Sequence, residues 1–143
     1  MTRIDFYSTD QSKLHIACKL AAKAVSQDLS VTIFAPDDAV ARALDRLLWS
    51  HPPTGFVPHC FAGDANAAQT PVIIVPVLEN SGPDHLLLNL ADSFPSAFGR
   101  FRRLIEIVST ADGDQDAARV RWRQYKERGY EVNHVNLTKA QTK

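Results

Sequence analysis

Hydrophobic and polar positions change their period several times along the chain, so that short apolar stretches alternate with longer amphipathic ones. Ile4 and Phe6 alternate with polar neighbours, which predicts a first strand. Apolar residues then recur with helical spacing over residues 11–27, and Thr9 or Asp10 is the expected N-cap of that helix. The chain therefore opens with a strand followed by an amphipathic helix.

The same unit repeats immediately. Residues 30–36, SVTIFAP, predict a second strand, and Asp37 is the expected N-cap of a second helix. The apolar side of that helix includes Leu44 and Leu48, and the helix is expected to end near Trp49. This order of elements predicts a single α/β domain with a doubly wound, mostly parallel sheet flanked by helices.

The second half of the chain supplies more strands. The continuous apolar run at 71–77 predicts a strand that is buried on both faces and central in the sheet. Further strands are predicted at 86–90, 104–108 and 130–137. A short helical or irregular crossover at 93–101 is expected to turn Phe94, Phe98 and Phe101 inward.

Residues 49–64, WSHPPTGFVPHCFAGD, show no helical period. Three of the eight prolines lie here, together with Trp49 and Phe56. We interpret this stretch as a stiff loop that either folds over the core or displays its aromatic side chains to a partner.

Basic residues are concentrated near the end of the chain. The segment 117–130, AARVRWRQYKERGY, holds five of the sixteen Lys and Arg residues. On a helical wheel Arg119, Arg123 and Lys126 share one side, and Trp122 lies at its border. Two interpretations stay open: a solvated charged face whose Trp covers the edge of the core, or a binding face for an acidic peptide or a nucleic-acid strand.

Composition narrows the functional classes. A chain of 143 residues with 45% hydrophobic content predicts one domain, 1–137, followed by a polar tail at 138–143. Sixteen basic residues balance sixteen acidic ones, so no global field favours non-specific DNA binding. Cys18 and Cys60 lack CxxC spacing, Cys18 is expected to be buried, and no stretch resembles a membrane span or signal peptide. We expect a cytoplasmic protein with reduced thiols and no membrane partner.

Common catalytic and cofactor motifs are missing from the sequence. The six glycines are too scattered for GxGxxG or GxxxxGK, and there is no GxSxG, HExxH or nucleophile and base pair. His51, His59 and Cys60 do not form a zinc motif, because zinc needs three or four ligands in closed geometry. No catalytic residue, cofactor or metal is expected.

Several motifs together resemble the chi subunit of bacterial DNA polymerase III, a small accessory protein of the clamp-loader complex. They are IDFYS at 4–8, ACKLAAKA at 17–24, Trp49 followed by FVPH at 56–59, EIV at 106–108 and RVRWRQYKERGY at 119–130. The last motif and the pairing of Trp49 with FVPH are the most specific. The resemblance implies a Rossmann-like fold without a nucleotide-binding loop and without catalysis.

The resemblance also implies two binding surfaces. In that family one surface holds the psi subunit, and another binds the acidic C-terminal tail of single-stranded DNA-binding protein. Carried over by position, the tail site would be Val108, Arg119, Trp122, Arg123 and Gly129. The psi surface would include Trp49 and Phe56.

The leading hypothesis is therefore a non-catalytic adaptor between psi and single-stranded DNA-binding protein, which reaches DNA only through the latter. One alternative is a direct single-stranded nucleic-acid-binding module that uses the same Arg and Trp face. Another is a nucleotide-dependent enzyme of the doubly wound class. Zero net charge argues against the first alternative, and the missing glycine-rich loops argue against the second.

Overall fold

The computed structural model describes residues 2–50, 58–61, 64, 70–78, 85–95, 97–111 and 113–137. Its strands are β1 (Arg3–Ser8), β2 (Val31–Phe34), β3 (His59–Phe61), β4 (Val72–Val75), β5 (Leu86–Asn89), β6 (Arg103–Val108) and β7 (Val132–Asn136). Its helices are α1 (Lys13–Ser26), α2 (Asp38–Ser50), α3 (Asp114–Glu127) and the 3-10 helix η2 (Phe98–Arg100).

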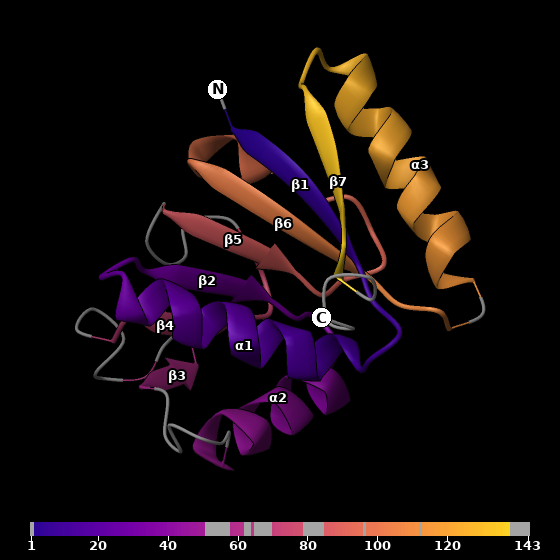
Figure 1. Ribbon diagram of the computed structural model, residues 1–143. Coiled ribbons are helices and arrows are strands. Elements are labelled where there is room, and N and C mark those ends of the chain that lie inside the picture. The colour runs from indigo at the N-terminus through magenta and orange to yellow at the C-terminus, as the bar shows by residue number, and fades with distance from the viewer. Residues whose placement is uncertain are drawn as a thin grey trace.

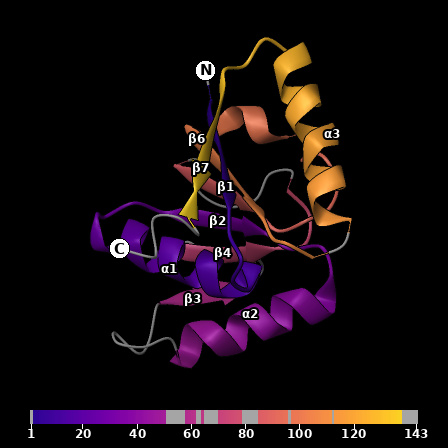
Figure 2. The ribbon, with the colours of Figure 1, turned by 45° about the vertical axis from the view of Figure 1, so that its right-hand side comes forward.

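The described strands form one sheet of seven, in the order β3-β4-β2-β5-β6-β1-β7, and every pairing is parallel. Helices cover both faces. Side chains of α1 and α2 pack on one face, and those of α3 and η2 pack on the other. Figure 2 shows α1 and α3 on opposite sides of the sheet. The predicted doubly wound, Rossmann-like α/β fold is confirmed.

The centre of the sheet is not where the apolar run at 71–77 predicted it. All four residues of β4 are buried, as expected, but β4 is the second strand from the edge, and β5 is the central one. A continuous apolar run indicates that both faces of a strand are covered, and every non-edge strand of this sheet meets that condition. The run therefore specified burial without specifying position.

Residues 49–64 do not form one loop. Trp49 belongs to α2, and residues 59–61 form β3, which pairs with β4 at the sheet edge. A strand of three residues is too short to show a period. His59 conceals it further, because this polar residue points inward with a side chain only 1% exposed and its Nε2 lies 2.8 Å from Asp45 Oδ1. Phe56 lies outside the described residues.

The two predicted N-caps have different outcomes. Asp37 is confirmed, since its Oδ1 accepts hydrogen bonds from the backbone N–H groups of Ala39 (2.9 Å) and Val40 (3.4 Å). The prediction of Thr9 or Asp10 is wrong, because α1 begins at Lys13 with Ser12 as its N-cap. Thr9 Oγ1 instead accepts from the backbone N–H of Gln11 at 3.0 Å and shapes the turn before the helix.

Cys18 is buried in the core between α1 and the sheet, as predicted. Burial raises the pKa of its thiol to about 11, which leaves it a protonated packing residue at neutral pH. None of the described helices is long and apolar enough to cross a membrane. The predicted polar tail, 138–143, lies outside the described residues.

Candidate functional site

The helix α3 ends in a Schellman motif at Gly129. This glycine has φ 88°, its N–H donates to Lys126 O (3.0 Å), and the N–H of Tyr130 donates to Tyr125 O (3.2 Å). A residue with a Cβ is strained in this left-handed conformation. Gly129, a predicted tail-site residue, therefore acts in this structure by ending α3 and turning the chain toward β7.

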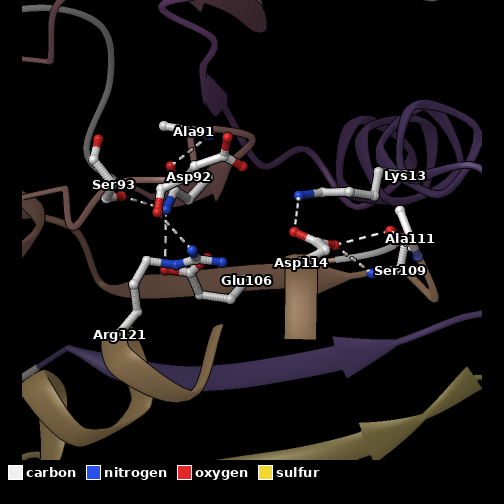
Figure 3. Close-up of polar contacts among 10 residues, drawn as sticks. Lys13, Ala91, Asp92, Ser93, Glu106, Ser109, Ala111, Asp114 and Arg121 are labelled. Carbon is white, nitrogen blue, oxygen red and sulfur yellow. Dashed lines mark hydrogen bonds and ion pairs between the residues drawn. The ribbon is translucent and has the colours of Figure 1, made fainter. Parts of the chain in front are cut away.

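The other end of α3 is fixed by Asp114. Its Oδ2 accepts hydrogen bonds from the backbone N–H (2.7 Å) and hydroxyl (2.9 Å) of Ser109, and its Oδ1 lies 3.2 Å from Lys13 Nζ (Figure 3). Burial acts to raise the pKa of this carboxyl, but the Ser109 hydrogen bonds and the Lys13 charge outweigh it and hold the pKa below its usual range. One side chain thus joins the start of α3 to the end of β6 and the start of α1.

A buried ion pair holds the middle of α3. Arg121 Nε lies 3.1 Å from Glu106 Oε1 on β6, and both side chains are almost completely buried. Arg121 Nη1 also donates to the carbonyl of Asp92 at 2.8 Å, as Figure 3 shows. Glu106 Oε2 accepts from the Tyr125 hydroxyl (2.6 Å) and from Asn89 Nδ2 (3.0 Å). Two side chains of α3 are therefore tied to the same carboxylate beneath the helix.

This network sets the charge state of its members. Burial raises the pKa of Glu106, while the Arg121 charge and the hydrogen bonds from Tyr125, Asn89 and Arg121 oppose that rise. Burial and the neighbouring Glu106 raise the pKa of Tyr125, so its hydroxyl stays a hydrogen-bond donor. Arg121 Nη2 has no hydrogen-bond partner among the described residues. The network therefore consists of one cation, one carboxyl group and neutral donors.

The network is not evident from the sequence, because Arg121 is one of five basic residues in the segment 117–130. Two signals point to it. Glu106 interrupts an apolar strand, LIEIV, and Arg121 lies four residues before Tyr125 and three after Ala118, on the inward side of the wheel. A charge in a buried strand calls for a buried partner, and Arg121 is in position to provide one.

The opposite side of α3 carries exposed cations. Arg119 Nη1 lies 3.4 Å from Asp116 Oδ1, and the two side chains are 74% and 83% exposed, so the pair is weak. Arg123 and Lys126 are also exposed, and their side chains make no ion pair with any described residue. These cations are free to meet the carboxylates of a ligand.

Trp122 lies between the exposed cations and the core. Its ring is half-buried and packs on Phe6 of β1 with ring centroids 5.0 Å apart. Val108, which is 8% exposed, belongs to the same apolar cluster as Phe6, and Trp122 packs against that cluster. The structure thus brings Val108, Trp122, Arg119 and Arg123 to one region. We call the exposed residues Arg119, Arg123 and Lys126, together with the half-buried Trp122, the α3 outer face.

A separate cleft of about 1000 Å³ lies at the carboxyl ends of the strands. Its lining includes the first residues of α1 and α3, and none of the predicted tail-site residues. Doubly wound folds commonly bind ligands in this position. The cation in its lining, Lys13, is paired with Asp114, while Asp10, Asp37 and Asp92 add carboxylates. The lining therefore disfavours a nucleotide phosphate.

The predicted psi surface is only partly described. Trp49, at the end of α2, is 61% exposed, and its ring lies 5.6 Å from that of His59, centroid to centroid. Figure 1 shows α2 near β3 at one edge of the sheet and α3 near β7 at the other. Trp49 and Trp122 therefore belong to well-separated surfaces.

The described residues contain no group of three or more His, Cys, Asp or Glu placed to hold a metal.

Comparison with known proteins agrees with the motifs. The family model described as "DNA polymerase III chi subunit, HolC" matches residues 1–133. The chain belongs to the DNA polymerase III chi subunit family. Among curated chi subunits, that of Pseudomonas aeruginosa is 36% identical over 141 residues, covering 96% of this chain and 98% of the relative. Those of Haemophilus influenzae and Escherichia coli are 32% and 30% identical, covering 85% and 82% of this chain and 85% and 81% of the relatives.

Proposed function

We propose that this chi-family chain is a non-catalytic accessory subunit that bridges the psi subunit of DNA polymerase III to the acidic C-terminal tail of single-stranded DNA-binding protein. The observation that carries the proposal is the α3 outer face, where one weakly paired cation, Arg119, and two cations without an ion pair to any described residue, Arg123 and Lys126, lie beside the half-buried Trp122 on a helix fixed from below. A rigid helix lowers the entropy lost when a flexible peptide binds. Three of the sixteen Lys and Arg residues lie on this face, although the protein as a whole is neutral.

The chemistry of the outer face fits an acidic peptide with an apolar end. Arg119 and Arg123 can each grip a carboxylate with two parallel hydrogen bonds. Trp122 and the apolar cluster on which it packs, which includes Val108, provide the apolar contact for a terminal aromatic side chain. Each charged hydrogen bond contributes roughly 1.5 to 3 kcal/mol net, less where water competes. DNA would be reached through the protein that owns the tail.

The direct test is calorimetric titration of the purified chain with an acidic peptide ending in Ile-Pro-Phe, with its C-terminally amidated copy and with a single-stranded oligonucleotide. We expect the free-acid peptide to bind most tightly, because the amide removes one carboxylate from the guanidinium pair. Equal affinity for peptide and amide would reject the carboxylate role of Arg119 and Arg123. Tighter binding of the oligonucleotide than of the peptide would favour the direct nucleic-acid-binding alternative.

The second half of the proposal concerns psi. A large exposed aromatic side chain such as Trp49 is a common anchor of protein interfaces, and the apolar segment that follows it includes Phe56. We expect Trp49→Ala and Phe56→Ala each to reduce co-purification with psi. The matched control is Val120→Ala, which removes an apolar side chain that is 53% exposed on α3. Undiminished psi binding by both aromatic variants would remove this half of the proposal.

The enzyme alternative has its own test. A ligand that binds only the native state raises the melting temperature. Because we expect no nucleotide to bind, a thermal-shift series with nucleoside triphosphates, dinucleotides and their magnesium complexes should leave the melting temperature unchanged. A concentration-dependent rise with any of them would bring the cleft at the carboxyl ends of the strands back into consideration.

A further inference from the structure

The pairing of β1 with β7 places His134 next to Phe6, the β1 residue on which Trp122 of α3 packs. Phe6 on β1 contacts the Trp122 ring, and the register places His134 of β7 opposite Phe6. Residues in register on neighbouring parallel strands point to the same face of a sheet. His134 therefore lies on the α3 side of the sheet, one strand nearer the edge than Phe6.

A hydrogen bond fixes the ring of this histidine. His134 Nε2 lies 2.9 Å from the hydroxyl oxygen of Ser8, two residues after Phe6 on the same strand face. The register also places Ser8 opposite Val108. With Nε2 held by Ser8, the other ring nitrogen, Nδ1, makes no hydrogen bond to any described residue. His134 is exposed, so Nδ1 is available to a ligand.

Two cations of α3, Arg119 and Lys126, lie on the same side of the helix as Trp122, which is the side toward β7 and His134. Arg121 and Arg128 point the other way, since Arg121 contacts the Asp92 carbonyl after β5 and Arg128 lies 4.7 Å above the Phe94 ring. On the wheel, Arg119, Trp122 and Lys126 occupy the side away from these two arginines and hence toward β7. Figures 1 and 2 show α3 running along β7 at this edge.

Arg119 and Lys126 are the cations on the side of α3 that runs along β7, and Asp116 pairs weakly with Arg119. Neighbours on the strands are uncharged: Ser8 and Phe6 on β1, Val108 on β6, and Val132 and Asn136 on the same face of β7. A carboxylate arriving here would find donors on two sides, from α3 and from β7.

We propose that His134 is a further recognition residue of the acidic-peptide site, forming its strand-edge wall and donating from Nδ1 to a peptide carboxylate. This inference rests on the proposed function of the α3 outer face and adds where the peptide lies: between α3 and β7, against Trp122.

The test is calorimetric titration of the full chain with the free-acid peptide ending in Ile-Pro-Phe, at one pH and constant ionic strength. His134→Ala should bind the peptide about fivefold more weakly than wild type, because it removes the Nδ1 donor and the strand-edge wall of the site. The control, Asn133→Ala, changes the preceding residue, on the other face of β7, and should bind the peptide like wild type.

The outcomes separate the two proposals. If His134→Ala keeps the wild-type affinity while Arg119→Ala weakens binding, the role of His134 is overturned and the α3 outer face stands. If the wild-type protein binds no peptide, both proposals fail together. An unchanged melting temperature of His134→Ala shows that a change in binding does not come from unfolding.

Discussion

Arg119 and Arg121 lie two positions apart on one helix, and their environments are opposite. The Arg121 side chain is 2% exposed and is held by Glu106, whereas the Arg119 side chain is 74% exposed and has only a weak pair with Asp116. The same residue type therefore fixes the helix on one side and is exposed to solvent on the other. Residue type alone does not assign a function to an arginine; its direction on the helix does.

The largest expected loss of stability comes from breaking the buried Glu106–Arg121 pair beneath α3. Glu106→Ala leaves Arg121 as an uncompensated buried charge, which should lower the free energy of unfolding by about 3–5 kcal/mol in urea denaturation. Asp116→Ala, which removes the partner of the exposed arginine, is the matched control and should change it by less than about 0.5 kcal/mol. If both variants lose the same small amount, the buried pair does not hold α3.

A double variant separates breaking the pair from replacing it. Glu106→Leu combined with Arg121→Met removes both charges and keeps apolar volume beneath α3, so it should be more stable than Glu106→Ala. Tyr125 and Asn89 would still lose their acceptor, so some loss is expected. A double variant less stable than Glu106→Ala would show that the charges stabilise the fold beyond their mutual pairing.

The anchor at the start of α3 is expected to have the next largest effect. Asp114→Asn weakens the contacts with Ser109 and Lys13 and should cost about 1–3 kcal/mol at pH 7. The pKa of Asp114 is lowered in the folded protein, so its contribution is full above the unfolded value near 3.9 and is lost as pH falls through the lower folded value. The stability difference between wild type and variant should therefore shrink below about pH 4.

Urea denaturation between pH 7 and pH 3 measures this difference. Asp38→Asn is the control, because Asp38 forms a pair with Arg42 in which both side chains are at least 70% exposed. That variant should show little loss at any pH. A loss for Asp114→Asn that stayed constant down to pH 3 would contradict the role given to its ionised form.

Substitution of Gly129, the left-handed residue that ends α3, should lower the free energy of unfolding by a smaller amount. Gly129→Ala places a Cβ at φ 88°, which should cost about 1–2 kcal/mol in unfolding free energy. Gly99→Ala, whose added Cβ would make an ordinary contact 3.7 Å from the Tyr130 hydroxyl, serves as the control. Equal stability of the two alanine variants would show that the left-handed turn is not required.

The smallest expected effect concerns the exposed pair itself. Asp116→Ala releases Arg119 from its weak pair and removes a negative charge from the outer face, so an acidic peptide should bind about twofold to threefold more tightly. Calorimetry at low salt resolves a change of this size, and added salt should reduce it. Weaker binding by this variant would show that Asp116 orients Arg119 for the ligand.

Much of the fold could be predicted, because hydrophobic period reports burial directly. The strands at residues 3–8, 31–34 and 86–89 and the three helices follow the predicted pattern. The period failed where polar residues are buried or strands are short. His59 is buried in a strand of three residues, and Arg121 is buried beneath its helix. In each case a carboxylate from another element of the chain, Asp45 or Glu106, forms a pair with the buried polar group.

The candidate site shows the same limit. Motif positions predicted Val108, Arg119, Trp122 and Arg123, and the structure brings them to one region of α3 and its sheet face. The proposed role of His134 could not be predicted, because 126 positions separate it from Ser8 in the chain and only the parallel register brings the two together. No local pattern in the sequence encodes that register.

The most direct test of the account compares Arg119→Ala/Arg123→Ala with wild type in calorimetric titration of the free-acid peptide, with Arg42→Ala as a matched exposed arginine on α2. We predict at least about tenfold weaker binding for the double variant, with an unchanged melting temperature and with Arg42→Ala like wild type. A double variant that binds the peptide as tightly as wild type would contradict the claim that the exposed side of α3 is the binding face.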